Sequence, residues 1–367
     1  MAQQSLPTGL PDPERLGDAF HVYEVDASGD RVRYYGEPLI ESDEVVSRVG
    51  PAFRQRGYRV QLHREMGEHV LVARERSLGV DGVPWVNVTL AVATLLSTLY
   101  AGTQWYGLSV AEDPTALLQA WPFAVAVLGV LTVHESGHYV FSRYHQVQAS
   151  LPYFIPLPFN PIGTLGAVIS MKDNIPNRTA LFDIGVAGPL AGLVATVAVT
   201  AVGVTLDPVR VSGGIVTQVE LGYPLLIRGV AALLGEQLVY SDANTLVNPV
   251  VIGGWVGAFV TFLNLLPVGQ LDGAHIARSL LGDRMERFAL VVPALLFGLA
   301  GYLLAFEGGR ATTLWGFWGV LALLFSRAGA ATPLDETPVG PGRKAVGALT
   351  LVLGLLCFAP VPIEITV

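Results

Sequence analysis

The sequence predicts a multi-span α-helical membrane protein that carries a small soluble α/β domain at its N-terminus. Hydrophobic residues make up 51% of the chain and charged residues only 14%, with a mean hydropathy of +0.50, whereas soluble domains carry about 25% charged residues. Several uncharged stretches approach or exceed the roughly 20 residues that cross a bilayer as a helix. We therefore expect about six to seven transmembrane helices, with apolar spans at 85–106, 116–141, 181–206, 249–266, 287–306, 312–326 and 345–362.

Residues 1–82 differ from the rest and form the expected α/β domain, which leaves residues 83–367 as the polytopic membrane domain. The first part holds 10 of the 22 Lys and Arg residues. Its hydrophobic alternation and turn residues predict strands and one helix: strands at 20–25, 31–35, 58–62 and 69–73, and a helix at 42–56. It contains no metal or phosphate motif, so its role is not indicated.

Two apolar segments are not expected to form ordinary transmembrane helices. The segment 151–171 contains four prolines, which forbid a continuous helix. Irregular backbone at membrane depth survives only where protein or water covers it, so we expect a re-entrant loop with a short strand near 164–171. The segment 223–238 has the leucine spacing of a helix that lies on the outer surface. A plain connecting loop is the alternative for both.

Charge and cysteine content exclude two kinds of site. The 22 basic and 30 acidic residues give a net charge of −8, which argues against nucleic acid as a direct ligand. The single cysteine, Cys357, permits neither an intramolecular disulfide nor a cysteine-based zinc site. Any metal must therefore be held by histidine and carboxylate.

The five residues from His134 to His138, His-Glu-Ser-Gly-His, stand at the end of an uncharged run that begins at Trp121. Positions i and i+4 share one helix face, so both imidazoles can bind one metal ion. Glu135 can reach a metal-bound water and take its proton. Such a polar cluster at the end of an apolar run is costly unless it is paired or metal-bound. The motif predicts a catalytic zinc site rather than two packed histidines.

A third metal ligand has to come from elsewhere in the membrane half. The candidates are Asp183, His145, Asp272 and His275. Asp272 gives the mixed His₂-carboxylate site usual for zinc peptidases, and Pro267 and Gly269 break the helix before it, which frees backbone to bring it inward. The alternative role for Asp272 is that of a helix cap.

These motifs together resemble the site-2 protease family of intramembrane zinc metalloproteases. The resemblance rests on His-Glu-Ser-Gly-His inside a span and on Asn-x-x-Pro-x-x-x-x-Asp-Gly at 264–273. It also rests on the Gly-rich stretch 185–192 and on the Pro-rich and Gly-rich loop 152–170. It is closest to the archaeal and plastid-type branch with a soluble N-terminal domain. The 207–248 loop is too short for a PDZ domain, and we expect no C-terminal CBS domains because the sequence ends at Val367.

The resemblance implies roles for individual residues. His134, His138 and Asp272 would bind Zn²⁺, Glu135 would be the general base and Asn264 would steady the oxyanion. The implied activity is hydrolysis of a peptide bond within or near a transmembrane segment of a single-span membrane protein, in regulated intramembrane proteolysis. Asn264 has a plain alternative role, an interhelical hydrogen bond.

Three other functions compete with this interpretation. A membrane transporter with a structural metal site would share the broken spans and buried acids, but it does not explain His-Glu-x-x-His on one helix. A prenyl-protein endopeptidase would carry Glu-x-x-x-Asp downstream, and no such pattern follows His138. A catalytically dead scaffold is disfavoured by the complete ligand set.

Loop charges predict the orientation in the cell membrane. If the N-terminal domain is cytosolic, the cytosolic loops carry nine Lys and Arg and the outer loops three, as the positive-inside rule requires. The active-site end then faces the cytoplasm. The only short β-like run near His138 in the membrane half, 164–171, is expected to pair with an unwound substrate. The expected partners are thus the substrate and the lipid bilayer, and nothing indicates an oligomeric state.

Overall fold

The computed structural model describes residues 10–27, 31–65, 67–75, 82–171, 173–211, 219–242, 244–288 and 290–365. The chain divides into two compact units, Met1–Asp81 and Gly82–Val367. Each unit has its own buried core and is described by itself.

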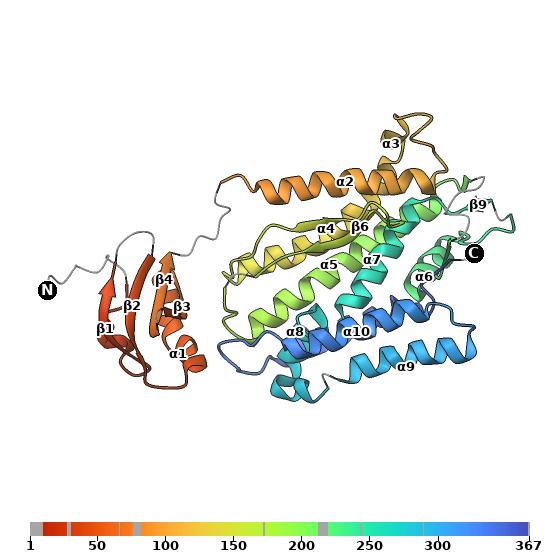
Figure 1. Ribbon diagram of the computed structural model, residues 1–367. Coiled ribbons are helices and arrows are strands. Elements are labelled where there is room, and N and C mark those ends of the chain that lie inside the picture. The colour runs from red at the N-terminus through yellow and green to blue at the C-terminus, as the bar shows by residue number, and fades with distance from the viewer. Residues whose placement is uncertain are drawn as a thin grey trace. The chain divides into compact units, whose positions relative to one another are not determined.

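The first unit is a four-stranded antiparallel sheet with one helix. Its strands are β1 (Phe20–Asp26), β2 (Arg31–Pro38), β3 (Tyr58–Glu65) and β4 (Glu68–Glu75), and they lie in the order β1-β2-β4-β3. A short helical turn η1 (Pro13–Leu16) precedes β1, and helix α1 (Ser42–Arg54) packs on one face of the sheet (Figure 1). Tyr34 and Phe53 meet edge to face there, with ring centroids 5.5 Å apart. The predicted α/β region of four strands and a helix is confirmed.

The second unit is predominantly helical (Figure 1). Its helices are α2 (Trp85–Trp105), α3 (Ala116–Gln119), α4 (Trp121–Tyr144), α5 (Arg178–Thr205), α6 (Leu225–Leu234), α7 (Val250–Asn264), α8 (Asp272–Leu281), η3 (Gly282–Phe288), α9 (Val291–Phe306), α10 (Thr312–Ala328) and α11 (Pro341–Leu356). Its strands are β5 (Tyr153–Pro156), β6 (Thr164–Val168), β7 (Val209–Arg210), β8 (Val219–Leu221), β9 (Thr245–Leu246) and β10 (Ile363–Ile365).

Every predicted span falls on a helix, namely α2, α4, α5, α7, α9, α10 or α11. Within the described residues, two of these helices, α2 and α5, are long and apolar enough by themselves to cross a bilayer. Helix α7 ends early because Pro267 and Gly269 follow it. The number of membrane crossings therefore stays a prediction.

Small residues let α4, α5 and α7 pack closely at the centre of the second unit. A Cβ added at Gly253 of α7 would lie 2.5 Å from the Cβ of Ala126 in α4. A Cβ added at Gly137 of α4 would lie 2.5 Å from the carbonyl oxygen of Ala187 in α5. Such backbone proximity is typical of helices that associate in membranes. This close packing brings side chains of α4, α5 and α7 near one another at the centre of the unit.

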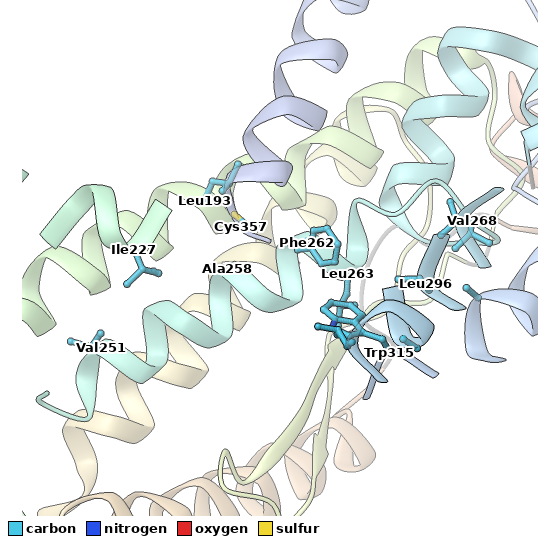
Figure 2. Packing of buried hydrophobic residues seen from close by; sticks show 14 of the residues in the cluster. Leu193, Ile227, Val251, Ala258, Phe262, Leu263, Val268, Leu296, Trp315 and Cys357 are labelled. Atoms are coloured by element: carbon cyan, nitrogen blue, oxygen red, sulfur yellow. The ribbon is translucent and has the colours of Figure 1, made fainter. Parts of the chain in front are cut away.

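A second packing centre lies where α5, α6 and α7 meet α9 and α10 (Figure 2). Trp315 and Phe262 meet edge to face there, with ring centroids 6.0 Å apart. Cys357 is 1% exposed in the same cluster. The only cysteine of the chain is thus a core residue.

The apolar segment 151–171 is a β-hairpin, in which β5 pairs antiparallel with β6. The prediction of a short strand is confirmed for Thr164–Val168. Strand β5 was not predicted because Pro152 precedes it and Pro156 is its last residue. Helix α2 holds the hairpin. Asn87 donates to the carbonyl oxygens of Leu151 and Pro152 at 3.0 Å, and Trp105 Nε1 donates to Pro161 O at 2.7 Å. These bonds satisfy carbonyl groups of an irregular backbone inside an apolar unit.

The segment 223–238 contains the expected helix, α6. Ile227 and Ala231 are buried, whereas Leu225 and Leu233 are exposed. The helix is therefore amphipathic and packs by one face. Whether its other face lies on a membrane surface stays a prediction.

Candidate metal centre

Two histidines of α4 form the first part of the site. His134 and His138 are 2% and 7% exposed, and their Nε2 atoms lie 3.3 Å apart. They share a face because they are one helical turn apart. Helix α4 runs without interruption from Trp121 to Tyr144, so it places the pair inside the packed unit.

Asp272 reaches the same point from α8. A tight turn follows α7, in which Gly269 adopts a left-handed φ of +60° and packs against the backbone of Phe325. Helix α8 then begins at Asp272, where the helix dipole stabilises a carboxylate. Its Oδ2 lies 3.3 Å from His134 Nε2 and 3.2 Å from His138 Nε2.

The three side chains fit a metal ion. Among the residues that the structure describes, His134, His138 and Asp272 are the one group of three or more potential ligands whose donor atoms all lie within 4.8 Å of one another. Asp272 Oδ2 is buried and yet has no hydrogen bond of acceptable geometry. Three donor atoms that converge on one point are expected where a cation lies between them. Two imidazoles and a carboxylate are ligands that Zn²⁺ accepts while one position stays open for water.

A backbone carbonyl sets the tautomer of His138. Its Nδ1 lies 2.9 Å from the carbonyl oxygen of Ile184 in α5, which can only accept a hydrogen bond. The proton is therefore assigned to Nδ1, and the lone pair of Nε2 is free for a metal. Metal-ligating histidines are commonly oriented in this way.

Glu135 and Asn264 line a cavity of about 160 Å³ beside the three ligands. Glu135 is 5% exposed. Asn264, the last residue of α7, places its amide nitrogen 3.2 Å from His134 Nε2. The strand β6 contributes Ala167 and Val168 to the cavity wall. All five predicted site residues are thus brought together around one small space.

Glycines of α5 make room for the histidines. A Cβ at Gly188 would overlap the ring of His138, and one at Gly192 would lie 2.7 Å from Nδ1 of His134. Sequence reasoning used this Gly-rich stretch only as part of a resemblance. The structure gives its physical reason, because α5 forms the wall against which both imidazoles pack.

The other candidate ligands are accounted for. Asp183 accepts hydrogen bonds from Arg343 at 2.8 and 2.9 Å and lies 2.9 Å from His145 Nε2, so it belongs to a separate ionic cluster. His275 lines the cavity but is not in the ligand group. Sequence reasoning did not place Ser142 or Gln270 there, because only tertiary contacts bring them to the cavity.

Comparison with known proteins agrees with this geometry. The family model described as Peptidase family M50 matches residues 122–299, which include every predicted site residue. Over these residues the chain matches this family. Family M50 is the site-2 protease family, so the resemblance inferred from the motifs is confirmed. Because these proteases are membrane proteins, the predicted class of membrane protein is confirmed as well.

Curated plant proteins are similar to most of the chain. Probable zinc metalloprotease EGY1, chloroplastic, of Arabidopsis thaliana is 35% identical over 250 residues, which are 66% of this chain and 43% of that protein. Probable zinc metalloprotease EGY2, chloroplastic, of the same plant is 29% identical over 261 residues, 71% of this chain and 45% of that protein. Probable zinc metallopeptidase EGY3, chloroplastic, also from Arabidopsis thaliana, is 31% identical over 293 residues, which are 75% of this chain and 48% of that protein.

The chain spans less than half the length of these relatives. Their names place them in the chloroplast, so the expected location in a cell membrane stays a proposal. No solved structure matches the chain.

The packing of α5 against the histidines predicts the effect of Gly188→Ala. The added methyl group overlaps the His138 ring, and overpacking of this kind costs about 1–3 kcal/mol. We expect the affinity for Zn²⁺ to fall by about 10- to 100-fold, measured by competition with a chromophoric chelator. Gly129→Ala on α4, where an added Cβ has nothing within 4 Å, is the matched control. Wild-type affinity in Gly188→Ala would contradict this account of α5.

Proposed function

We propose that the chain is an intramembrane zinc metalloprotease that hydrolyses a peptide bond within or near a transmembrane segment of a single-span membrane protein. The observation that carries the proposal is the position of Glu135, a buried carboxylate, beside the ligand group in a cavity. A structural metal site, as in the transporter alternative, needs neither an adjacent buried carboxylate nor an open space. The names of the relatives support the choice of zinc.

The residues divide the chemistry among them. His134, His138 and Asp272 would hold Zn²⁺, which when bound acidifies a water molecule and polarises a carbonyl group. Glu135 accepts the proton of the attacking water and afterwards delivers it to the amine that leaves. Asn264 donates a hydrogen bond from its amide to the carbonyl oxygen as negative charge develops there.

A replacement of Glu135 tests this function. Glu135→Gln keeps the ligands but cannot accept a proton, so we expect zinc content to stay and cleavage to fall by about 10²- to 10⁴-fold. Quantitative proteomics of membranes that contain the wild-type or Glu135→Gln chain will identify the substrates, and elemental analysis will give the zinc content. Asp272→Ala should lose zinc. Residual cleavage above about 1% in Glu135→Gln would remove Glu135 from this role.

We also propose that the substrate binds as a strand along β6. A peptide bond in a transmembrane helix must unwind before hydrolysis, and each exposed N–H or C=O costs several kcal/mol if it stays unpaired. Strand β6 pairs with β5 along one edge, and it lines the cavity with Ala167 and Val168. Pairing along its other edge would satisfy the unwound substrate.

Proline substitutions test the strand proposal. Successive N–H groups of a strand point to opposite edges, so one of Ala167→Pro and Val168→Pro removes a donor from the edge away from β5. We expect that variant to lower the cleavage rate by at least about tenfold while zinc content is unchanged. The same substrate should be used for both variants. If neither variant slows cleavage, the hairpin has only a packing role.

The proposed orientation places the N-terminal unit and the active-site end in the cytoplasm of a cell. It rests on the nine-to-three bias of loop charges. Cysteine labelling in a Cys357→Ala background tests it, with Leu39→Cys in the N-terminal unit and Glu112→Cys between α2 and α3, both exposed positions. An impermeant maleimide should label Glu112→Cys in intact cells and Leu39→Cys only after permeabilisation. The reverse pattern would invert the topology.

A further inference from the structure

His275 is a buried polar side chain without a partner. It is 6% exposed, and its Nδ1 has no hydrogen-bond partner within the described part of the chain. Burial of an unpaired polar group costs about 1–3 kcal/mol. A group of this kind in a native structure requires an explanation.

The position of His275 associates it with the reaction. It follows Asp272 by three residues, so both side chains lie on one face of α8. It lines the same cavity of about 160 Å³ as Glu135 and Asn264. Because its nitrogens do not belong to the ligand group, the ring faces the contents of the cavity rather than completing the metal site.

The backbone of His275 is fixed by its neighbours. A Cβ added at Gly185 of α5 would lie 2.8 Å from the Cβ of His275. Ser279 Oγ donates a hydrogen bond to the His275 carbonyl oxygen at 2.7 Å, and the His275 N–H donates to Leu271 O at 3.2 Å. A donor held in this way loses little freedom when it binds a ligand, as preorganised catalytic groups require.

The enclosure of Nδ1 identifies the donor atom. Nδ1 is buried and has no acceptor among the described residues. A neutral imidazole carries one proton, and a proton on Nδ1 would be left without an acceptor. We therefore assign the proton to Nε2, the nitrogen that remains to face the cavity that His275 lines.

We propose that His275 is a catalytic residue, whose Nε2–H donates a hydrogen bond to the carbonyl oxygen of the scissile peptide bond. The inference rests on the proposed proteolytic function. The bond strengthens as the oxygen takes negative charge, so it stabilises the transition state more than the bound substrate. Asn264, at the end of α7, and His275, on α8, thus supply two donors from different helices.

The test compares His275→Leu, His275→Gln and Leu281→Ala. Removal of one such donor lowers kcat by about 10²- to 10³-fold, so we expect this loss in His275→Leu with zinc content unchanged. His275→Gln, which keeps an amide donor, should recover part of the rate. Leu281→Ala alters an exposed position of the same helix, outside the cavity lining, and should retain wild-type kcat. The substrate is one found in the Glu135→Gln comparison.

A binding measurement gives a readout that does not depend on turnover. The probe is N-phosphoryl-Leu-Ala, whose tetrahedral phosphoryl group carries charge where the intermediate does. Its affinity for zinc-loaded His275→Leu should fall by about the same factor as kcat, as measured by titration calorimetry in detergent.

Two results would overturn the inference. One is a kcat and a probe affinity of His275→Leu within about threefold of wild type, against the loss that a donor predicts. The other is loss of zinc from both His275 variants, which would make His275 part of the metal site. A zinc-loaded wild-type chain that cleaves no membrane protein would contradict the proposed function instead, and the probe affinities would still decide the role of His275.

Discussion

The second unit must keep two imidazoles and a carboxylate close together among apolar helices. The arrangement of its central helices depends on this requirement. Each group would be costly there alone, and Asp272 Oδ2 lies 3.2–3.3 Å from both imidazole nitrogens without bonding either. Their positions fit a cation, and they require α4 and α8 to converge. The break after α7 and the left-handed turn at Gly269 serve this convergence.

The hairpin lies next to the metal centre because α2 holds β5 and β6 beside the cavity. Side chains at both ends of α2, Asn87 and Trp105, bind carbonyl oxygens that the hairpin leaves unpaired. These bonds lower the cost of an irregular backbone inside an apolar unit. Under the proposed function, the open edge of β6 would pair with the groups that the substrate exposes when it unwinds.

The local parts of this site could be predicted from the sequence, and the long-range parts could not. His134 and His138 are one turn apart, so their shared face follows from helix geometry. Asp272 could be chosen because the membrane half has few carboxylates and a helix break precedes it. The contact of Asn264 with His134 and the unpaired state of His275 depend on packing between separate helices. No periodicity or spacing in one sequence reports such contacts.

Helix α5 contributes no metal ligand, yet it shapes the site as much as α4 does. The absence of side chains at Gly188 and Gly192 gives both imidazoles their space, and the Ile184 carbonyl orients one of them. A larger side chain at either glycine would displace the imidazole beside it. The residues that α5 can carry at these two positions therefore depend on the ligands that α4 presents.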